Sequence, residues 1–294
     1  MKTLTLPNGL HADVLDAFEA RVLYREIFEM GIYTDHGLHI HEGDCVVDIG
    51  ANVGLFSLMA LQAGRNIRLF AAEPIPALHE PLRRNLERYA GQSQITLLPF
   101  GLSAHPGEAE FVVTPHSSMT TTMHPTKILT DVSLMDRMDA ALADFAAASP
   151  DQRPLIDHLR RLVSVPVLGH LTALALSAAF LPFSVRNTLL TQRICCSLRT
   201  LSQVIDEYHI ETIDLLKIDV EGSEAEVVQG IAEVDWARIR QIVIEVHDVE
   251  GRAEELRALL ERQGYQTYMQ QPDWALLHLM HIYTLYGIRT DEIR

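Results

Sequence analysis

The chain has 294 residues, of which 48% are hydrophobic and 21% charged, so it can bury the core of one large α/β domain. Its formal net charge of −15 disfavours a nucleic-acid substrate, because proteins that bind nucleic acids usually present a basic face to the phosphates. Three cysteines without a CxxC spacing disfavour a zinc site and are typical of a reducing compartment. The first residues lack the apolar stretch of a signal peptide, so we expect a cytoplasmic protein.

The N-terminal region predicts a helix over residues 14–30, because apolar residues recur there at helical spacing and Gly31 follows as a stop. We assign residues 1–42 to an N-terminal helical cap. Strand and helix signals then alternate, with strands at 45–49, 67–72 and 95–98 and helices at 55–63 and 77–89. This alternation favours a parallel sheet with helices on both faces.

The alternation breaks over residues 115–199, which are irregular and helix-like, with helices expected at 140–148 and 155–163. Within them, the apolar run 163–183 is interrupted by prolines, which leave fewer than the ~20 continuous residues that a membrane-spanning helix needs. We therefore expect no membrane association. We interpret 115–199 as a helical insertion that forms a lid and contributes the acceptor site.

This insertion also differs from the rest of the chain in charge. Residues 116–200 contain eight Lys or Arg and six Asp, a balance of +2, which leaves −17 for the remainder. Arginines above the active site suit an acidic partner, such as an acyl carrier protein that delivers the substrate. A solvated lid without a partner is the alternative.

After the insertion the alternation resumes and completes the core, which we assign to residues 43–114 and 200–294. Two strands in succession close the chain, which indicates an antiparallel edge strand in a mixed sheet. The expected elements are helices at 201–208, 223–230 and 253–263 and strands at 213–218, 241–246, 265–270 and 278–286.

A glycine-rich turn follows the first core strand, in the sequence VVDIGANVG at residues 46–54. Gly50 ends the strand where a side chain would block a ligand, and Gly54 lets the next helix pack close to the strand. Asp48 would repel a phosphate, and it suits an amino-bearing ligand. The spacing differs from the GxGxxG of dinucleotide-binding proteins.

Glu73 ends the second core strand, where an acidic residue accepts hydrogen bonds from both hydroxyls of a ribose. Together with Asp48 and the two glycines, it describes a nucleoside with an amino-acid arm and no phosphate. That ligand is S-adenosylmethionine. The sequence therefore predicts a methyltransferase.

Four segments resemble the FkbM family of methyltransferases: VVDIGANVG at 46–54, Glu73-Pro74, GLS at 101–103 and LLKIDVEGSE at 215–224. Within that family, LYREIF at 23–28 and IEVHD at 244–248 are similar to O-methyltransferase domains that are embedded in polyketide synthases or work beside them. The resemblance implies a Rossmann-like class I methyltransferase, with a seven-stranded mixed sheet, helices on both faces and an inserted helical lid. It also implies methyl transfer to a hydroxyl group.

Carried over residue by residue, the resemblance also implies a set of cofactor contacts. It places Asp48, Gly50, Asn52 and Gly54 in the cofactor loop, Glu73 and Pro74 at the ribose, Gly101, Leu102 and Ser103 along the adenine, and Asp219 near the methionine arm or the acceptor.

Methyl transfer to a hydroxyl requires an aligned oxygen and a base that removes its proton. His247 follows the fifth core strand, next to the strand end that carries Asp219 and Glu221, so we expect His247 as the base. Glu221 or Asp219 would orient it, and Glu245, two residues earlier on the same side of the strand, could do so too.

Several alternatives stay open. The acceptor could be a sugar or an amine, and the chain could be an inactive cofactor-binding module. A Mg²⁺-dependent O-methyltransferase is a further possibility, because Asp219 and Asp248 offer the oxygen ligands that this ion prefers, although His247 does not suit it. We expect no resident metal, and we interpret the histidines at 36, 39 and 41 as part of a solvated loop.

Overall fold

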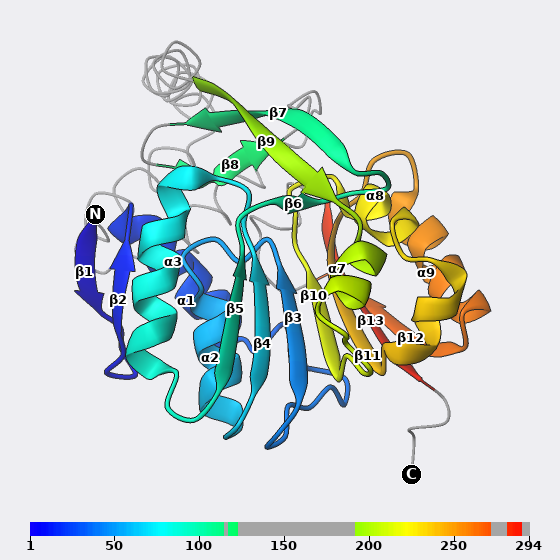
Figure 1. The fold of residues 1–294 in the computed structure, drawn as a ribbon, viewed down its shortest axis with the longest axis horizontal. Coiled ribbons are helices and arrows are strands. Elements are labelled where there is room, and N and C mark those ends of the chain that lie inside the picture. Colours follow the sequence, from blue (N-terminus) through cyan, green and yellow to red (C-terminus); the bar gives the residue numbers. More distant parts are fainter. Residues whose placement is uncertain (115–116, 123–191, 272–280, 290–294) are drawn as a thin grey trace, which may run out of the picture.

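The computed structural model describes residues 1–114, 117–122, 192–271 and 281–289. Its centre is a seven-stranded sheet with the strand order β12-β13-β11-β10-β3-β4-β5 (Figure 1). The five strands β3, β4, β5, β10 and β11 are parallel to one another, whereas β13 is antiparallel to both β11 and β12. The strands are β3 (Cys45–Ile49), β4 (Arg68–Ala72), β5 (Gln94–Leu98), β10 (Leu215–Ile218), β11 (Gln241–His247), β12 (Tyr265–Gln270) and β13 (Ile282–Arg289).

Helices cover both faces of this sheet and create two hydrophobic cores. Alternate residues of a strand point to opposite faces, so Val46 belongs to one core and Val47 to the other. The first core packs α1 (Ala17–Tyr24), α2 (Leu55–Ala63) and α3 (Pro76–Tyr89) against the sheet; the second packs α7 (Leu201–Glu207), α8 (Glu224–Gln229) and α9 (Arg252–Arg262). The predicted seven-stranded mixed sheet with helices on both faces is confirmed.

One detail of the predicted sheet is wrong. The antiparallel strand was expected at the edge, but β13 lies between β11 and β12. The chain passes from β11 through α9 to β12, and β13 then fills the gap between these two strands. β13 pairs with β11 over seven residues and with β12 over six, so its backbone groups are bonded on both sides.

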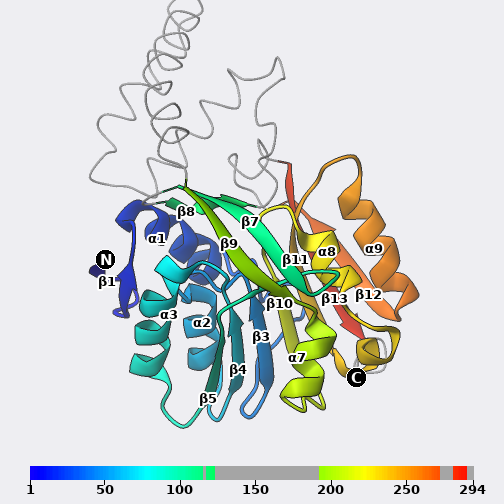
Figure 2. The ribbon, with the colours of Figure 1, turned by 45° about the horizontal axis from the view of Figure 1, so that its top comes forward.

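A second sheet of four strands, in the order β6-β9-β7-β8, crosses above the carboxyl ends of the parallel strands (Figure 2). It consists of β6 (Gly101–Leu102), β7 (Gly107–Thr114), β8 (Ser117–Thr122) and β9 (Gln192–Arg199). We call it the roof sheet. Residues 117–122 and 192–199, predicted as parts of a helical insertion, are therefore strands. The expected helices at 140–148 and 155–163 and the apolar run 163–183 lie outside the described residues.

The N-terminal cap also differs from the expected single helix. It begins with an antiparallel pair, β1 (Lys2–Thr5) and β2 (His11–Val14), so the residue that was to start the helix ends a strand. After α1 the chain widens into a π-helical turn, η1 (Arg25–Glu29), where Met30 N–H donates to the carbonyl of Arg25. Gly31, with φ +66°, follows this turn as the predicted stop.

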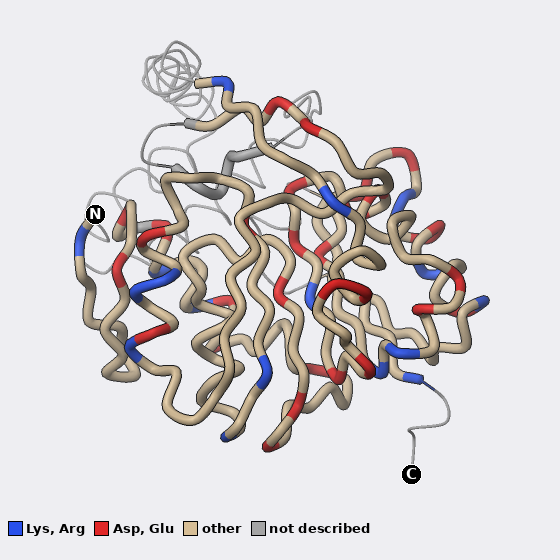
Figure 3. Tube along the Cα trace, viewed as in Figure 1, with Lys and Arg blue, Asp and Glu red and all other residues tan. Residues whose placement is uncertain are grey.

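Charges are interspersed over the described part of the chain. Asp and Glu positions occur all over the trace, and Lys and Arg positions do not gather on one face (Figure 3). Among the described helices, none is both long and apolar enough to cross a membrane.

Candidate active site

The turn after β3 brings two strand ends into close contact. Gly50 has φ +79°, and a Cβ atom built on it would lie 1.7 Å from the backbone carbonyl oxygen of Asp219, which follows the neighbouring strand β10. Glycine is therefore required here because the two chain segments touch. Gly50 also lines the cavity at this edge of the sheet, so the prediction that a side chain would block a ligand there stays a prediction.

Gly54 has a different neighbour from the one expected. It precedes α2 with φ +89°, and a Cβ atom would lie 2.8 Å from Leu82 and 3.3 Å from Leu86, both on α3. The absent side chain thus allows α3 to approach the start of α2, rather than α2 to approach the strand.

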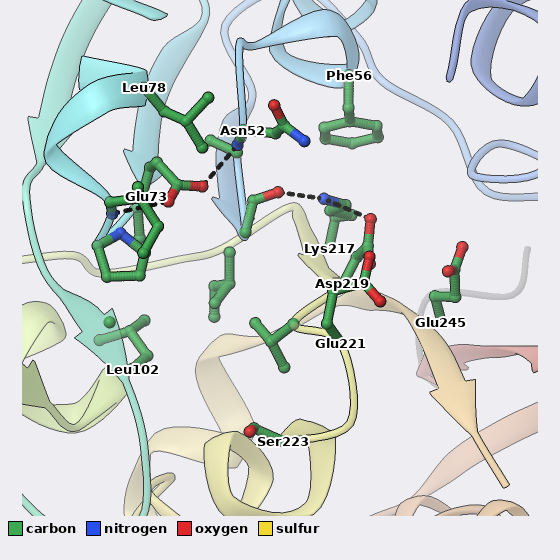
Figure 4. A pocket seen from close by; sticks show the side chains of 18 of the residues that line it. Asn52, Phe56, Glu73, Leu78, Leu102, Lys217, Asp219, Glu221, Ser223 and Glu245 are labelled. Carbon is green, nitrogen blue, oxygen red and sulfur yellow. Dashed lines mark hydrogen bonds and ion pairs between the residues drawn. The ribbon is translucent and has the colours of Figure 1, made fainter. Parts of the chain in front are cut away.

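Glu73 is buried at the end of β4, where it ties together two backbone segments. Its Oε2 accepts a hydrogen bond from the backbone N–H of Asn52 at 2.9 Å, and its Oε1 accepts one from Ile75 N–H at 2.9 Å (Figure 4). Burial raises the pKa of Glu73 to about 7, although these backbone hydrogen bonds oppose the rise. The carboxylate also lines the cavity beneath the roof sheet and retains acceptor capacity for hydroxyl groups.

One cavity lies between the carboxyl ends of the sheet strands and the roof sheet. Seven of the expected cofactor residues line it, namely Gly50, Asn52, Glu73, Pro74, Gly101, Leu102 and Asp219. The roof sheet contributes Phe111 of β7, beside Gly101 and Leu102 of β6. Asp48, Gly54 and Ser103 are not among the lining residues. Ser103 N–H instead bonds the carbonyl of Arg199, which links the start of the roof sheet to its last strand.

Asp48 is fully buried and interacts with protein groups rather than facing the cavity. Ser57 Oγ donates to its Oδ2 at 2.6 Å, and Lys217 Nζ lies 3.1 Å from its Oδ1. The expected contact between Asp48 and an amino-bearing ligand is therefore replaced by an ion pair with Lys217.

Lys217 is a further residue of the site, which the sequence motifs alone do not single out. Its ammonium also donates to the carbonyl of Gly50 at 2.9 Å and lies 3.3 Å from Asp219 (Figure 4). Burial alone lowers the pKa of Lys217, but Asp48 and Asp219 raise it above the ordinary value, so the side chain stays charged. A lysine inside the otherwise apolar strand LLKI was the available signal.

Acidic side chains gather at the end of the cavity beyond β10 and β11. Tyr33 O–H lies 3.1 Å from Asp219 Oδ2 and 3.0 Å from Glu245 Oε2. A phenol has one proton to donate, so Tyr33 can donate to only one of the two carboxyl groups at a time. Burial and the neighbouring Asp219 raise the pKa of Glu245 to about 8. Glu245 therefore bonds Tyr33, and among the described residues the partners of His247 are Glu221 and Glu224 rather than Glu245.

His247 lies between two carboxylates. Its Nδ1 is 3.1 Å from Glu224 Oε1, and its Nε2 is 3.3 Å from Glu221 Oε2. Burial alone lowers the pKa of His247, but Glu221 and Glu224 raise it to about 11. The ring is then protonated at neutral pH and cannot accept a further proton, which disagrees with a neutral histidine base. The expected pairing with Glu221 is present, whereas Glu224 is an additional partner.

Glu221 faces the cavity next to His247. Its side chain is 28% exposed, and it adopts φ +53° in the turn between β10 and α8. Burial raises its pKa to about 7, while the positive His247 limits the rise. A carboxylate with this pKa is partly ionised at neutral pH and can accept a proton there.

Metal coordination has no candidate within the described ranges. No three His, Cys, Asp or Glu side chains there are grouped so that they could hold an ion. Of the three histidines before β3, His36 has its Nε2 2.9 Å from Gln270 Oε1 and stacks on Tyr268. It is therefore engaged with the edge of the sheet.

The strand order, the cavity at the carboxyl ends of the parallel strands and the buried acid at the end of β4 together define a class I S-adenosylmethionine-dependent methyltransferase. Residues 177–267 match the model of the methyltransferase FkbM domain. The chain is 32% identical over 271 residues to the 31-O-demethyl-FK506 methyltransferase FkbM of Streptomyces tacrolimicus, covering 92% of this chain and 91% of that protein. It belongs to the FkbM methyltransferase family.

Two further relatives differ in how much of their own length this chain matches. Methyltransferase sdnD of Sordaria araneosa is 28% identical over 291 residues, with 94% of this chain and 95% of that protein covered. The AMB antimetabolite synthetase AmbE of Pseudomonas aeruginosa is 32% identical over 289 residues, which cover 97% of this chain but 12% of AmbE. The matching region is thus nearly the whole of one relative and a small part of another.

Proposed function

We propose that this protein transfers a methyl group from S-adenosylmethionine to a hydroxyl group of a natural-product intermediate of the polyketide type. The observation that carries the proposal is the cavity-facing carboxylate Glu221, held by His247 at the ends of β10 and β11. An alcohol must lose its proton as it is methylated, and a carboxylate with a pKa of about 7 is suited to receive it.

The cavity fits the cofactor at both of its ends. Glu73 is aimed into it and would accept hydrogen bonds from the ribose hydroxyls, while Gly101 and Leu102 would border the adenine. Asp219, held by Lys217 and Tyr33, would contact the methionine arm. When bound, S-adenosylmethionine supplies an electrophilic methyl group.

The remaining chemistry belongs to this chain's own residues. The acceptor hydroxyl gives its proton to Glu221, and the protonated His247 keeps that carboxylate oriented and limits its pKa. Glu224 accepts hydrogen bonds from Gly222 N–H and from the His247 ring, so it fixes the ring on the side away from Glu221. In this arrangement Glu221 is the base and His247 is a positioning residue.

The acceptor class is supported by the relatives. The name of the Streptomyces relative states that it acts on 31-O-demethyl-FK506, which is a substrate with a free oxygen to be methylated. We extend this to an oxygen acceptor here, and we propose that the acceptor arrives either free or bound to an acyl carrier protein.

The proposal is tested by incubating the protein with S-adenosylmethionine and a panel of β-hydroxyacyl thioesters, both free and carrier-bound. We expect the mass gain of one methyl group in place of a hydrogen, with fragmentation that locates it on the hydroxyl oxygen. Reactions with Glu221→Gln and without cofactor are the controls. Methylation of nitrogen or carbon in an acceptor panel of matched size would contradict the proposal.

A further inference from the structure

Glu26 is a buried carboxylate that the proposed reaction does not use. It lies on η1, is 4% exposed and lines the cavity. Within the part of the chain that the structure describes, its carboxylate forms neither a hydrogen bond nor an ion pair. Burying such a group without a partner is unfavourable, so its presence in the wall of a ligand cavity requires an explanation.

The cations of the cavity are engaged elsewhere. Five carboxylates line it, those of Glu26, Glu73, Asp219, Glu221 and Glu245, against the two cations Lys217 and His247. Lys217 is bound by Gly50, Asp48 and Asp219, and His247 is bound by Glu221 and Glu224. Tyr33 has one hydroxyl proton and lies within hydrogen-bond distance of both Asp219 and Glu245. Among the described residues that line the cavity, neither cation forms an ion pair with Glu26 or Glu245.

The local backbone holds Glu26 in this position. The π-helical turn from Arg25 to Glu29 adds a residue to the helical turn, and such turns often occur where a helix presents a functional side chain. The turn places its two acidic side chains in different environments: Glu26 is buried at the cavity, and Glu29 is exposed. Burial and the carboxylates of Glu245, Asp219 and Glu221 raise the pKa of Glu26 well above its ordinary range, while the adjacent Arg25 opposes the rise.

We propose that Glu26, together with Glu245, binds an ammonium group of a ligand in this cavity. A compact cation next to these two carboxylates would donate hydrogen bonds to them and would favour their ionised forms. The ammonium group could belong to the methionine arm of the cofactor or to an amino-bearing acceptor. The inference rests on the proposed function in one respect, because that function supplies the two candidate ligands. It does not require that the methyl group is transferred to an oxygen.

The first arm of the test uses the cofactor product. Calorimetry compares S-adenosylhomocysteine with its desamino analogue, in which hydrogen replaces the α-amino group, on the wild type, on Glu26→Gln and on the control Glu29→Gln. If the cofactor provides the ammonium group, Glu26→Gln binds S-adenosylhomocysteine at least about tenfold more weakly and binds the desamino analogue unchanged. Glu29→Gln, with the same substitution on the exposed side of η1, should behave as the wild type.

The second arm uses protein saturated with S-adenosylhomocysteine and a pair of alcohols, 6-amino-1-hexanol and 1-hexanol. If the acceptor provides the ammonium group, the wild type and Glu29→Gln prefer the amino alcohol, and Glu26→Gln loses this preference. The proposal is overturned if Glu26→Gln changes no amine-dependent affinity in either arm. Because both arms measure binding, a failure of the O-methyltransferase proposal leaves their result unaffected.

Discussion

At the scale of single residues, the central question is which group removes the acceptor proton. Glu221→Gln should lower the methyl-transfer rate by ~10²–10⁴, the usual contribution of a general base, while cofactor affinity stays close to that of the wild type. His247→Gln should lower the rate less and should move the rise of the pH–rate profile to higher pH. The reason is that His247 lowers the pKa of Glu221, which is about 7 in the wild type.

The two variants distinguish the possible bases. Measurement of kcat against pH on both variants and the wild type provides the comparison, with calorimetry to check cofactor binding. If His247→Gln abolishes the reaction while Glu221→Gln retains it, His247 is the base in spite of its pKa of about 11. An unchanged pH profile in His247→Gln would contradict its role as a positioning residue.

The sequence predicted those site residues that follow the ends of the parallel strands, because their place in the chain fixes where they lie in the fold. Glu73, Asp219, Glu221 and His247 are of this kind, and all four line the cavity. Residues that reach the site from elsewhere were missed. Tyr33 comes from the segment before the first core strand, and Lys217 from the middle of β10; neither position is predictable without the packing of the cap and the ion pair with Asp48.

At the scale of elements, the contact between the ends of β3 and β10 makes a prediction about Gly50. Gly50→Ala should destabilise the protein by about 3 kcal/mol or more, for two reasons. The alanine would be held in a left-handed backbone conformation, and its Cβ atom would overlap the carbonyl of Asp219. Gly251 is a matched control, since its φ is +87° and nothing lies within 4 Å of its Cβ position. Gly251→Ala should cost only the backbone strain, about 1–2 kcal/mol.

Urea unfolding of the two variants tests this prediction. Equal losses of stability would mean that the left-handed conformation alone matters and that the turn can move away from Asp219. The reason for a larger loss in Gly50→Ala is that the obstructing atom belongs to the backbone, which cannot rotate aside as a side chain can.

The elements that sequence patterns identify well are those with a clear hydrophobic period. The parallel strands β3, β4, β10 and β11 are almost fully buried, and they were predicted from their apolar runs; β5 lies at the edge of the sheet and is only partly buried. The roof sheet was not, because β9 reads QRICCSLR and follows a segment with helical composition. Its pairing with β7 over seven residues is a long-range contact, from Gly107–Val113 to Gln192–Leu198, which no local pattern reveals. The β1–β2 hairpin was missed for a related reason, since its two strands have only four residues each.

At the scale of the whole molecule, ion pairs within the protein reduce the positive charge that residues 116–200 can offer to a partner. Two of the arginines counted in the insertion are engaged by acids of the core: Arg193 pairs with Glu110, and Arg199 lies 2.5 Å from Glu207. Without these two, residues 123–191 contain six basic and six acidic side chains, so their net charge is zero. Attraction of an acidic carrier protein must then come from a local feature, and the adjacent pair Arg160–Arg161 is the candidate in the sequence.

Reversing the charge of that pair tests whether the acceptor is delivered by a carrier protein. Arg160→Glu with Arg161→Glu should lower kcat/KM for a carrier-bound β-hydroxyacyl substrate by about tenfold at low salt, because charges outside the reacting centre act mainly on the rate of encounter. The free thioester should react at nearly the wild-type rate, and the difference should shrink as salt rises, since salt screens exposed charges.

A matched control is the reversal of Arg65 and Arg262, which are exposed and lie three residues before β4 and β12, near the amino ends of these strands. This double variant changes the net charge by the same amount, so it separates a local docking effect from a general change of charge. If the Arg160 and Arg161 variant loses activity equally on both substrates, or if the control variant shows the same selective loss, these arginines do not dock a carrier. The acceptor would then reach the cavity as a free molecule.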